Sequence, residues 1–188
     1  KTSNQFLMNT WTLINNIIEP DFYTCYYVFM KNFTATFVNH QYISKNWMYI
    51  QSAIIASFEN AEFNNNYTLQ AIVNEVSKDI ISQKKSHFHI VAKNKKNEIV
   101  GAIFSIPEIK IDNSNTCHIG WFFSIPQLYR KERLFVSDLM INKAHAYLRN
   151  LGYTAITTEI GTVAGERLLT KKYGYKKTNN SEWIKYLI

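Results

Sequence analysis

The segment from Thr116 to Leu151 constrains the fold of this chain more than any other part of the sequence. Its first part, Thr116 to Ile125, is rich in β-branched and aromatic residues and ends at Pro126, which predicts a strand followed by a turn. The basic stretch Gln127 to Arg133 then opens a helical pattern that reaches Leu151. A strand that leads into a helix through a tight turn directs several backbone N–H groups at one point. The segment therefore predicts an anion-binding site at the start of the helix.

The composition indicates a packed chain that attracts anions. Of the 188 residues, 46% are apolar and 15% are aromatic, which is typical of a folded core and not of a disordered tail. This length suits one domain over residues 1–188, mainly helical over 1–85 and with a core sheet over 86–188. The formal net charge of +7 favours phosphorylated ligands, nucleic acid or acidic membrane as partners, and a solvated basic surface explains it equally well.

Cysteine content and hydrophobic patterning bear on the compartment. Cys25 and Cys117 form neither a disulfide framework nor a Cys-x-x-Cys metal site, so both are predicted to be reduced, buried thiols. We recognise no signal peptide, and no apolar run approaches the length needed to cross a bilayer. A cytoplasmic location without a membrane partner is therefore expected.

The remaining chain predicts helices first and a mixture of strands and helices afterwards. Residues 4–18 have a helical period, whereas Asp21 to Val38 leaves strand and helix both open. Two further helices are predicted with Ser44 and Thr68 as N-caps. Their inward residues are Trp47, Ile50, Ile54 and Phe58 in the first, and Leu69, Ile72, Val73, Val76 and Ile80 in the second. Further strands are expected at His87–Ala92, Ile99–Ile106 and Ala155–Ile160, a helix near Ala164–Lys172, and a final hairpin of Tyr175–Thr178 with Trp183–Ile188. This order predicts an α/β or α+β fold.

Several short motifs resemble the GNAT superfamily of acyl-CoA-dependent N-acetyltransferases. Phe123-Ser-Ile-Pro126 resembles the end of the family's central strand, and Tyr129-Arg130 resembles the start of the turn that holds the coenzyme A diphosphate. Leu151-Gly152-Tyr153 is similar to the usual end of the long helix, Lys172-Tyr-Gly-Tyr175 to the closing signature, and the hairpin with Glu98-Ile-Val-Gly-Ala102 to the central strands. The resemblance covers roughly residues 85–188. It implies a GNAT-like α/β (α+β) fold, with a mixed, mostly antiparallel central sheet flanked by helices.

The resemblance also implies an acetyl-CoA site, although this chain lacks the family's glycines in the phosphate turn. Glycine lets the backbone approach phosphate closely, so here helix N–H groups and basic side chains are expected to supply the contacts. Basic residues at a helix start oppose the helix dipole unless an anion binds there, and solvent-facing side chains are the alternative. The implied cofactor-binding residues are Phe123, Ser124 and Ile125 through their backbone, and Arg130, Lys131, Glu132, Arg133, Leu134 and Phe135 at the turn.

Three residues are candidates for the chemistry of acetyl transfer, which needs a neutral amine and an acid for the departing thiolate. Strict alternation places His118 on one strand face with Phe122 and Ser124, where relatives often carry a general base. Glu159 on the next strand is the second candidate base. Many relatives protonate the thiolate with a tyrosine at a position that is Thr170 in this chain. A histidine bonded within the fold and a carboxylate in solvent are the structural alternatives for the two bases.

The leading functional prediction is an N-acetyltransferase that moves an acetyl group from acetyl-CoA to a primary amine of a small molecule or a protein, without a metal. A GNAT-shaped protein that binds coenzyme A or a polyanion without turnover is the main alternative. A nucleic-acid-binding module fits the charge but shows no recognised motif. His87-x-His89 and Cys117-His118 offer metal ligands without the spacing of a closed site, so histidines within a strand are the simpler interpretation. A homodimer, as in many family members, is compatible with the aromatic amino-terminal half.

Overall fold

Eight strands form two four-stranded sheets in the computed structural model, which describes residues 32–64, 68–81, 87–110, 114–178 and 182–187. The first sheet has the order β1 (Phe33–Val38), β2 (His87–Asn94), β3 (Ile99–Pro107) and β5 (Phe122–Ser124), and every neighbouring pair is antiparallel. The second has the order β4 (Thr116–His118), β6 (Ala155–Thr158), β8 (Trp183–Tyr186) and β7 (Lys176–Lys177). In it β4 and β6 are parallel, and the other pairs are antiparallel.

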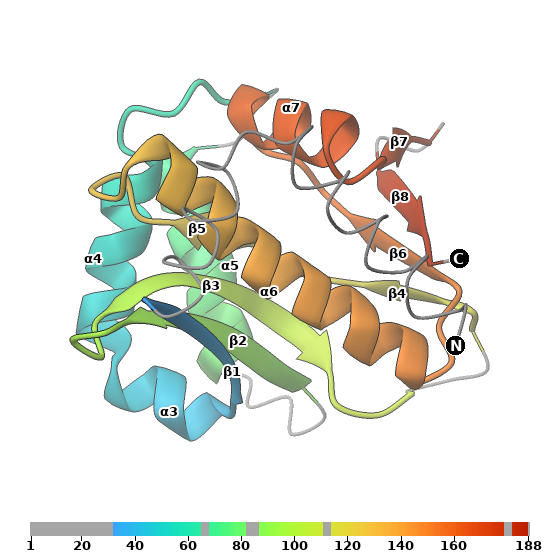
Figure 1. Cartoon of the computed structure of the whole chain (residues 1–188), viewed down its shortest axis with the longest axis horizontal. Coiled ribbons are helices and arrows are strands. Elements are labelled where there is room, and N and C mark those ends of the chain that lie inside the picture. The colour runs from blue at the N-terminus through green and yellow to red at the C-terminus, as the bar shows by residue number, and fades with distance from the viewer. Residues whose placement is uncertain (1–31, 65–67, 82–86, 111–113, 179–181, 188) are drawn as a thin grey trace, which may run out of the picture.

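Helices cover both faces of the first sheet, as Figure 1 shows. The long helix α6 (Arg130–Asn150) crosses one face, and α7 (Val163–Lys171) contributes to the same hydrophobic cluster. The helices α3 (His40–Lys45), α4 (Trp47–Phe58) and α5 (Leu69–Ile81) lie on the opposite face. The predicted fold class, a mixed and mostly antiparallel sheet flanked by helices, is confirmed. No helix in the described ranges is both long enough and apolar enough for a bilayer crossing.

The sheet separates two hydrophobic clusters. Met140 and Val136 of α6 belong to the first cluster, while Ile50 and Ile54 of α4 belong to the second, and all four are fully buried. Burying one such side chain stabilises a fold by about 1.5–3 kcal/mol. The first cluster requires Gly101 on β3, because a Cβ atom there would lie 2.9 Å from Met140 Cε and 2.8 Å from a backbone oxygen of β5.

The predicted amino-terminal helices are largely right in their inward residues and partly wrong in their caps. The inward residues that are buried are Ile50, Ile54, Phe58, Ile72, Val73 and Val76; Trp47 and Leu69 are partly buried, and the side chain of Ile80 lies outside the described part of the structure. Thr68 caps α5 as predicted, since its Oγ1 accepts a hydrogen bond from Ala71 N at 3.1 Å. Ser44 was predicted as a cap but lies inside the short helix α3, whose N-cap is Asn39, with Oδ1 3.0 Å from Tyr42 N. The side-chain carbonyl of Asn39 therefore starts the helical region earlier than expected. Residues 4–18 lie outside the described part of the chain, and of residues 21–38 the described end forms β1.

The strand predicted from Thr116 to Ile125 is interrupted, which corrects the sequence-based alternation. Gly120 N donates to Phe104 O at 3.1 Å, and Phe104 N donates to Trp121 O at 2.9 Å, so two residues lie opposite one. This pattern is a β-bulge, which adds one residue to a strand and rotates the following side chains. Accordingly Ile119 lies in the cluster beneath α6, while Phe123 lies in the cluster beneath α4 and α5. His118 and Phe122 therefore do not share a face.

The two sheets diverge directly after the bulge. Ile119 N still donates to Thr157 O of β6 at 3.0 Å, whereas Gly120 N already donates to β3. Beyond this point β5 pairs with β3, and β6 ends at Thr158 without pairing to β5. The edge of β5 that faces away from β3 is thus open to the space between the sheets.

Candidate functional site

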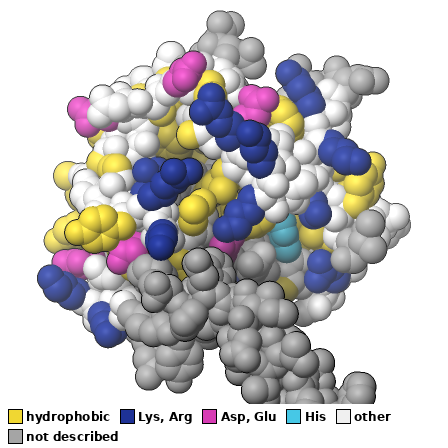
Figure 2. All heavy atoms as spheres, turned by 45° about the horizontal axis from the view of Figure 1, so that its top comes forward, with side chains coloured by type: hydrophobic (Ala, Val, Ile, Leu, Met, Phe, Trp, Pro, Cys, Tyr) yellow, Lys and Arg dark blue, Asp and Glu magenta, His cyan; other side chains and the backbone are white. Residues whose placement is uncertain are grey.

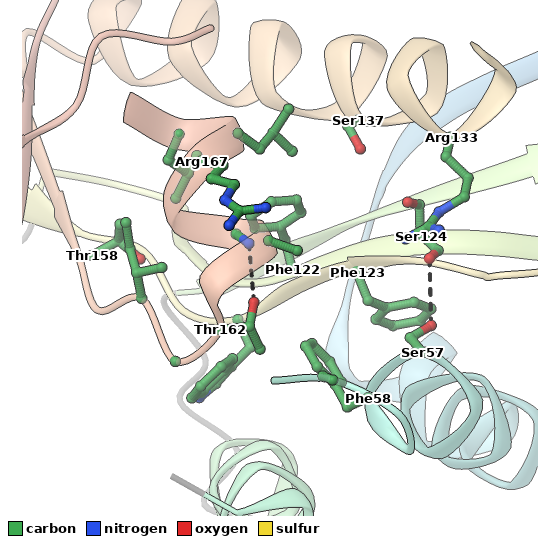
Figure 3. Close-up of a pocket in the computed structure, with 18 of the residues that line it drawn as sticks. Ser57, Phe58, Phe122, Phe123, Ser124, Arg133, Ser137, Thr158, Thr162 and Arg167 are labelled. Atoms are coloured by element: carbon green, nitrogen blue, oxygen red, sulfur yellow. Dashed lines mark hydrogen bonds between the residues drawn. The ribbon is translucent and has the colours of Figure 1, made fainter. Parts of the chain in front are cut away.

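A cavity of about 700 Å³ lies where β5 and β6 diverge. One wall comes from the first turns of α6 and from α7, and the opposite wall comes from the end of α4. Figure 3 shows side chains from all of these elements directed into the same space. The cavity therefore reaches both faces of the sheet, and two ligands that meet between β5 and β6 would approach it from different sides.

The open edge of β5 presents backbone groups to the cavity. Ile125 N donates to Val100 O at 2.9 Å, and Trp121 O accepts from β3 at the same distance. Because backbone groups alternate in an antiparallel ladder, Phe123 also faces β3, and the N–H and C=O groups of Phe122 and Ser124 point the other way. Ser57 Oγ of α4 lies 3.5 Å from Ser124 O, which agrees with that direction. An extended ligand with amide groups has hydrogen-bond partners along this edge.

The N-terminus of α6 lies at one end of the cavity. Arg133 N is the first backbone group of the helix to bond within it, to Tyr129 O at 2.9 Å, so the preceding N–H groups stay open to a ligand. Tyr129 N is the exception, since it donates to Glu132 Oε2 at 3.0 Å. Of the predicted cofactor-binding residues, those that line the cavity are Phe123, Ser124, Arg130, Arg133 and Leu134, and those that do not are Ile125, Lys131, Glu132 and Phe135.

Positive charge is concentrated on the wall formed by α6 and α7. Arg130 and Arg133 of α6 and Arg167 and Lys171 of α7 line the cavity, and Glu159 is the one acidic residue that does so. Within the described residues, no ion pair or hydrogen bond holds the guanidinium group of Arg130, Arg133 or Arg167. Figure 2 shows dark-blue basic side chains around a hollow with hydrophobic side chains between them, and Figure 3 shows Arg133 and Arg167 extending from their helices into the cavity. Such a wall attracts a polyanionic ligand.

Ser137 adds a polar group to the same wall. The residue is 3% exposed, lines the cavity from α6 and points its hydroxyl into it (Figure 3). Among the described residues this hydroxyl has no hydrogen-bond partner. The hydroxyl is accessible to the cavity, because no buried side-chain nitrogen or oxygen of the described residues lacks a hydrogen-bond partner. The arrangement therefore favours a ligand with an atom that hydrogen-bonds to Ser137.

The predicted catalytic residues are not brought together. Glu159 lines the cavity directly after β6, so of the three it is the one placed at the site. His118 is exposed, with Nδ1 3.4 Å from Thr157 Oγ1, and it does not line the cavity. Thr170 also lies outside the lining, because its Oγ1 donates to Glu166 O of its own helix at 2.7 Å.

The cavity residues that sequence reasoning missed include Thr162, Arg167 and the serines 57 and 137. Thr162 is the N-cap of α7, with Oγ1 accepting from Gly165 N at 3.1 Å, and a threonine directly before a helical pattern is a cap signal that could have been read. Arg167 precedes the basic Lys171 by one helical turn, which places both on one face of α7. The serines 57 and 137 carry no recognisable signal, because a serine on a helix is usually unremarkable. Their place in the cavity lining is recognised only from the structure, in which α4 and α6 flank the cavity.

Polar side chains on the far side of α6 are paired. Asp138 accepts from Lys172 Nζ at 2.6 Å and from Tyr173 Oη at 2.5 Å, which ties α6 to the end of α7. His145 Nε2 lies 3.0 Å from Tyr175 Oη. Burial, with Lys185 and Arg149 nearby, lowers the pKa of His145 to about 4. Burial and the neighbouring Asp138 raise the pKa of Tyr173, so this phenol is a weak acid held away from the cavity.

The buried histidine of β2 has structural partners, and the described cysteine is a buried free thiol. His89 is fully buried, its Nε2 lies 3.0 Å from His40 Nδ1, and its Nδ1 accepts from Ser105 N at 3.2 Å. Burial raises the pKa of the free Cys117 thiol to about 12. Over the described ranges, no three side chains of His, Cys, Asp or Glu are grouped as metal ligands. The other predicted thiol, Cys25, lies outside the described residues.

Comparison with known proteins identifies the fold through structure. No protein-family model matches the sequence, and no curated protein sequence is similar to it. A GNAT family acetyltransferase from Brucella melitensis in complex with acetyl-CoA aligns with a TM-score of 0.57 and 15% identity, over 83% of this chain and 88% of that one. The GNAT family N-acetyltransferase YhbS from Escherichia coli, in complex with CoA, gives 0.56 and 13% over 84% and 82%. The polyamine N-acetyltransferase of Drosophila melanogaster, which forms N-acetylagmatine, gives 0.51 and 13% over 78% and 84%. The GNAT resemblance seen in the sequence is thus confirmed for the fold.

Proposed function

We propose that this chain is an N-acetyltransferase that transfers an acetyl group from acetyl-CoA to a primary amine. The single observation that carries the proposal is the divergence of β5 from β6 beside an α6 N-terminus whose basic side chains have no partner among the described residues. Structural relatives with this fold were determined with CoA or acetyl-CoA bound, which supports the same ligand here.

The residues of the cavity fit acetyl-CoA group by group. Arg130, Arg133 and the open N–H groups of α6 suit a diphosphate, because guanidinium groups and helix N-termini both bind phosphate oxygens. The open edge of β5 at Phe122 and Ser124 suits the two amides of a pantetheine chain. The unpaired hydroxyl of Ser137 offers one further hydrogen bond from the opposite wall. The replacement of the family's glycines is therefore compatible with phosphate binding through side chains.

The chemistry that acetyl-CoA supplies is an acyl group activated as a thioester. The acceptor ammonium loses a proton, its nitrogen attacks the thioester carbonyl carbon, the C–N bond forms and the C–S bond breaks, and the thiolate takes up the second proton from nitrogen. In this chain Glu159 is the acidic residue that lines the cavity, and we assign it the role of accepting the first proton, directly or through water. Its exposed position at the end of β6 lets the proton pass on to solvent.

Binding and turnover are tested separately. Isothermal titration with acetyl-CoA should give micromolar affinity, compared with much weaker binding of free phosphate. Thiol release from acetyl-CoA in the presence of a panel of primary amines then measures transfer. Arg133→Ala should weaken acetyl-CoA binding about tenfold, as expected for one charge-assisted contact. The matched control is Lys131→Ala, which removes a neighbouring positive charge that does not line the cavity and should leave affinity within about threefold. Equal effects of the two variants, or no binding by the unmodified chain, would contradict the proposal.

Binding without turnover is the second candidate function. It is favoured by the hydroxyl of Thr170, which donates to Glu166 O of its own helix, and by the hydroxyl of Tyr173, which donates to Asp138. Neither group is placed to protonate a departing thiolate. Tight acetyl-CoA binding without thiol release from any amine would establish this alternative, and thiol release that depends on an amine would exclude it.

A further inference from the structure

The basic wall of the cavity carries more positive charge than a diphosphate needs. Its cations in the described lining are Arg130 and Arg133 of α6 and Arg167 and Lys171 of α7. The two phosphates of a diphosphate linkage carry about one negative charge each, which the two arginines of α6 match. The two cations of α7 are therefore available to a second anionic group.

The charged side chains of α7 and its C-cap divide into a paired set and an unpaired set. Glu166 accepts with Oε2 from Asn64 Nδ2 at 3.0 Å, and Lys172 Nζ lies 2.6 Å from a carboxylate oxygen of α6. Within the described residues, no hydrogen bond or ion pair holds the side chain of Arg167 or Lys171. The unpaired residues are the ones that line the cavity, and the paired residues do not line it. This division favours a ligand at α7 over a purely structural role.

The anion at α7 would be held by side chains and not by the helix start. Val163 N and Gly165 N already donate to protein acceptors, at 3.0 and 3.1 Å. Arg167 and Lys171 are four residues apart, so they lie on one face of the helix. Two cations one turn apart suit a phosphate monoester, which presents three acceptor oxygens and carries about 1.5 to 2 negative charges near pH 7.

Acetyl-CoA carries one phosphate of this kind besides its diphosphate. It is a monoester on the 3′ carbon of the ribose whose 5′ carbon bears the diphosphate. Because a single ribose joins the two groups, their binding sites must be neighbours. The first turns of α6 and the helix α7 form one wall of the cavity, and Figure 3 shows Arg133 and Arg167 extending from the two helices into one space. The cations of the two helices therefore meet this condition.

We infer that Arg167 and Lys171 form a second phosphate site, which binds the 3′-phosphate of acetyl-CoA. This inference rests on the proposed acetyl transfer and specifies how the chain selects its co-substrate. CoA is then distinguished from 3′-dephospho-CoA, which has the same thiol, pantetheine chain and diphosphate. An acid group on the acceptor is the other anion that these cations would fit, and the experiment separates the two.

The experiment is titration calorimetry of the full chain with CoA and with 3′-dephospho-CoA, without an acceptor. We expect CoA to bind about tenfold more tightly, because two cations contact its extra phosphate and contacts between exposed charges are individually modest. The double variant Arg167→Ala and Lys171→Ala should bind the two ligands with affinities equal within about twofold, since the partners of that phosphate are gone.

A matched control removes the same charge from elsewhere. The double variant Lys176→Ala and Lys177→Ala changes two exposed lysines of β7, which do not line the cavity, and should keep the preference for CoA. Loss of the preference in this control would show that net charge, and not a site on α7, is responsible, and would overturn the inference. Urea denaturation verifies that all variants are folded.

The remaining outcomes separate this inference from the proposed function. Equal affinity of the unmodified chain for CoA and 3′-dephospho-CoA would overturn the inference and leave acetyl transfer intact. A preference for CoA that survives in the α7 variant would also overturn it. If that variant instead loses kcat/KM selectively for amines that bear an acid group, the α7 cations serve the acceptor. Failure of both CoA forms to bind would overturn the inference and the proposed function together.

Discussion

The two halves of helix α6 differ in whether their inward-facing polar side chains have partners within the protein. In the first two turns, Arg130, Arg133 and Ser137 face the cavity, and within the described residues none of these side chains has a hydrogen-bond or ion-pair partner. From the next residue onward the pattern changes, because Asp138 is bonded to two side chains of the segment after α7, and His145 is bonded to Tyr175. One continuous helix thus contains both arrangements.

This difference distinguishes polar side chains that stabilise the fold from polar side chains that are accessible to a ligand. A paired polar group contributes to the stability of the native state, whereas a polar group that opens onto a cavity without a protein partner contributes little to stability and is accessible to a ligand. The first half of α6 is therefore expected to affect affinity with little effect on stability. The second half is expected to do the reverse, and each of the following changes tests one side of that contrast.

The largest effect is expected from removing both arginines of the first half. The double variant Arg130→Ala and Arg133→Ala should weaken acetyl-CoA binding about 100-fold, equivalent to about 3 kcal/mol, because two charge-assisted contacts to phosphate are lost. The free energy of unfolding without ligand should stay within about 0.5 kcal/mol, since neither side chain has a partner among the described residues. Calorimetry and urea denaturation measure the two quantities. A large loss of stability would show that the arginines also support the fold.

A slightly smaller effect, on stability this time, is expected for Asp138. Asp138→Ala removes the acceptor of both Lys172 Nζ and Tyr173 Oη, and Tyr173 is 9% exposed. The loss of a charged acceptor for a buried hydroxyl should lower the free energy of unfolding by about 2–3 kcal/mol. Asp138→Asn keeps an acceptor and should recover part of that loss. Acetyl-CoA affinity, measured at a temperature where the variant is folded, should change by less than about threefold. A large loss of affinity would mean that the contact between α6 and α7 also shapes the cavity.

The pH dependence of stability tests the buried histidine of the second half. The pKa of His145 is lowered in the folded chain from an ordinary value of 6.5 to about 4. Between these values the unfolded chain binds a proton that the folded chain does not, so the stability present above pH 6.5 falls as the pH is lowered toward 4. Moving from pH 7.5 to pH 5 should cost about 2 kcal/mol from this residue. His145→Gln should show a shallower loss of stability over the same interval in urea denaturation. Identical pH profiles would exclude His145 as the source.

The smallest effect is expected at Ser137. Ser137→Ala removes one hydrogen bond to the ligand and should weaken acetyl-CoA binding about fivefold, equivalent to about 1 kcal/mol. Stability without ligand should stay within about 0.5 kcal/mol, because the hydroxyl opens onto the cavity and has no partner among the described residues. Ser52→Ala is a suitable control, since Ser52 is an exposed helical serine bonded to Met48 O of its own helix. If Ser137→Ala destabilises the unliganded chain instead, its hydroxyl belongs with the paired groups.

The fold was largely predictable because it follows from local patterns. The strand, proline and long helix around Pro126 and the final hairpin at Trp183 are marked by periodicity, turn residues and caps, which are properties of neighbouring residues. The GNAT-like motifs added the order of the elements, and the structural comparison agrees with it. The cap at Ser44 was wrong because Asn39, only five residues earlier, offers a competing cap.

The candidate site was less predictable because its geometry depends on distant pairing. Whether Gly120 and Trp121 form a bulge is decided by Phe104 on β3, and no local pattern contains that information. Regular alternation would place His118 on the same strand face as Ser124. In the structure the bulge lies between them and puts the two residues on different faces. The cavity lining from Arg167 and from the serines of α4 and α6 likewise depends on how three helices are placed. The sequence was informative about which charged residues lie near the start of α6 and uninformative about which of them face the cavity.

The bulge depends on the number of residues between β4 and β5 more than on which amino acids they are. Removing one residue between Ile119 and Phe123 would restore regular alternation and exchange the surroundings of every side chain up to Pro126. Trp121 and Phe123 would then be turned toward α6, and Phe122 toward α4. Homologous chains with the same bulge are thus expected to vary in residue type along this stretch but to keep its length, without insertions or deletions.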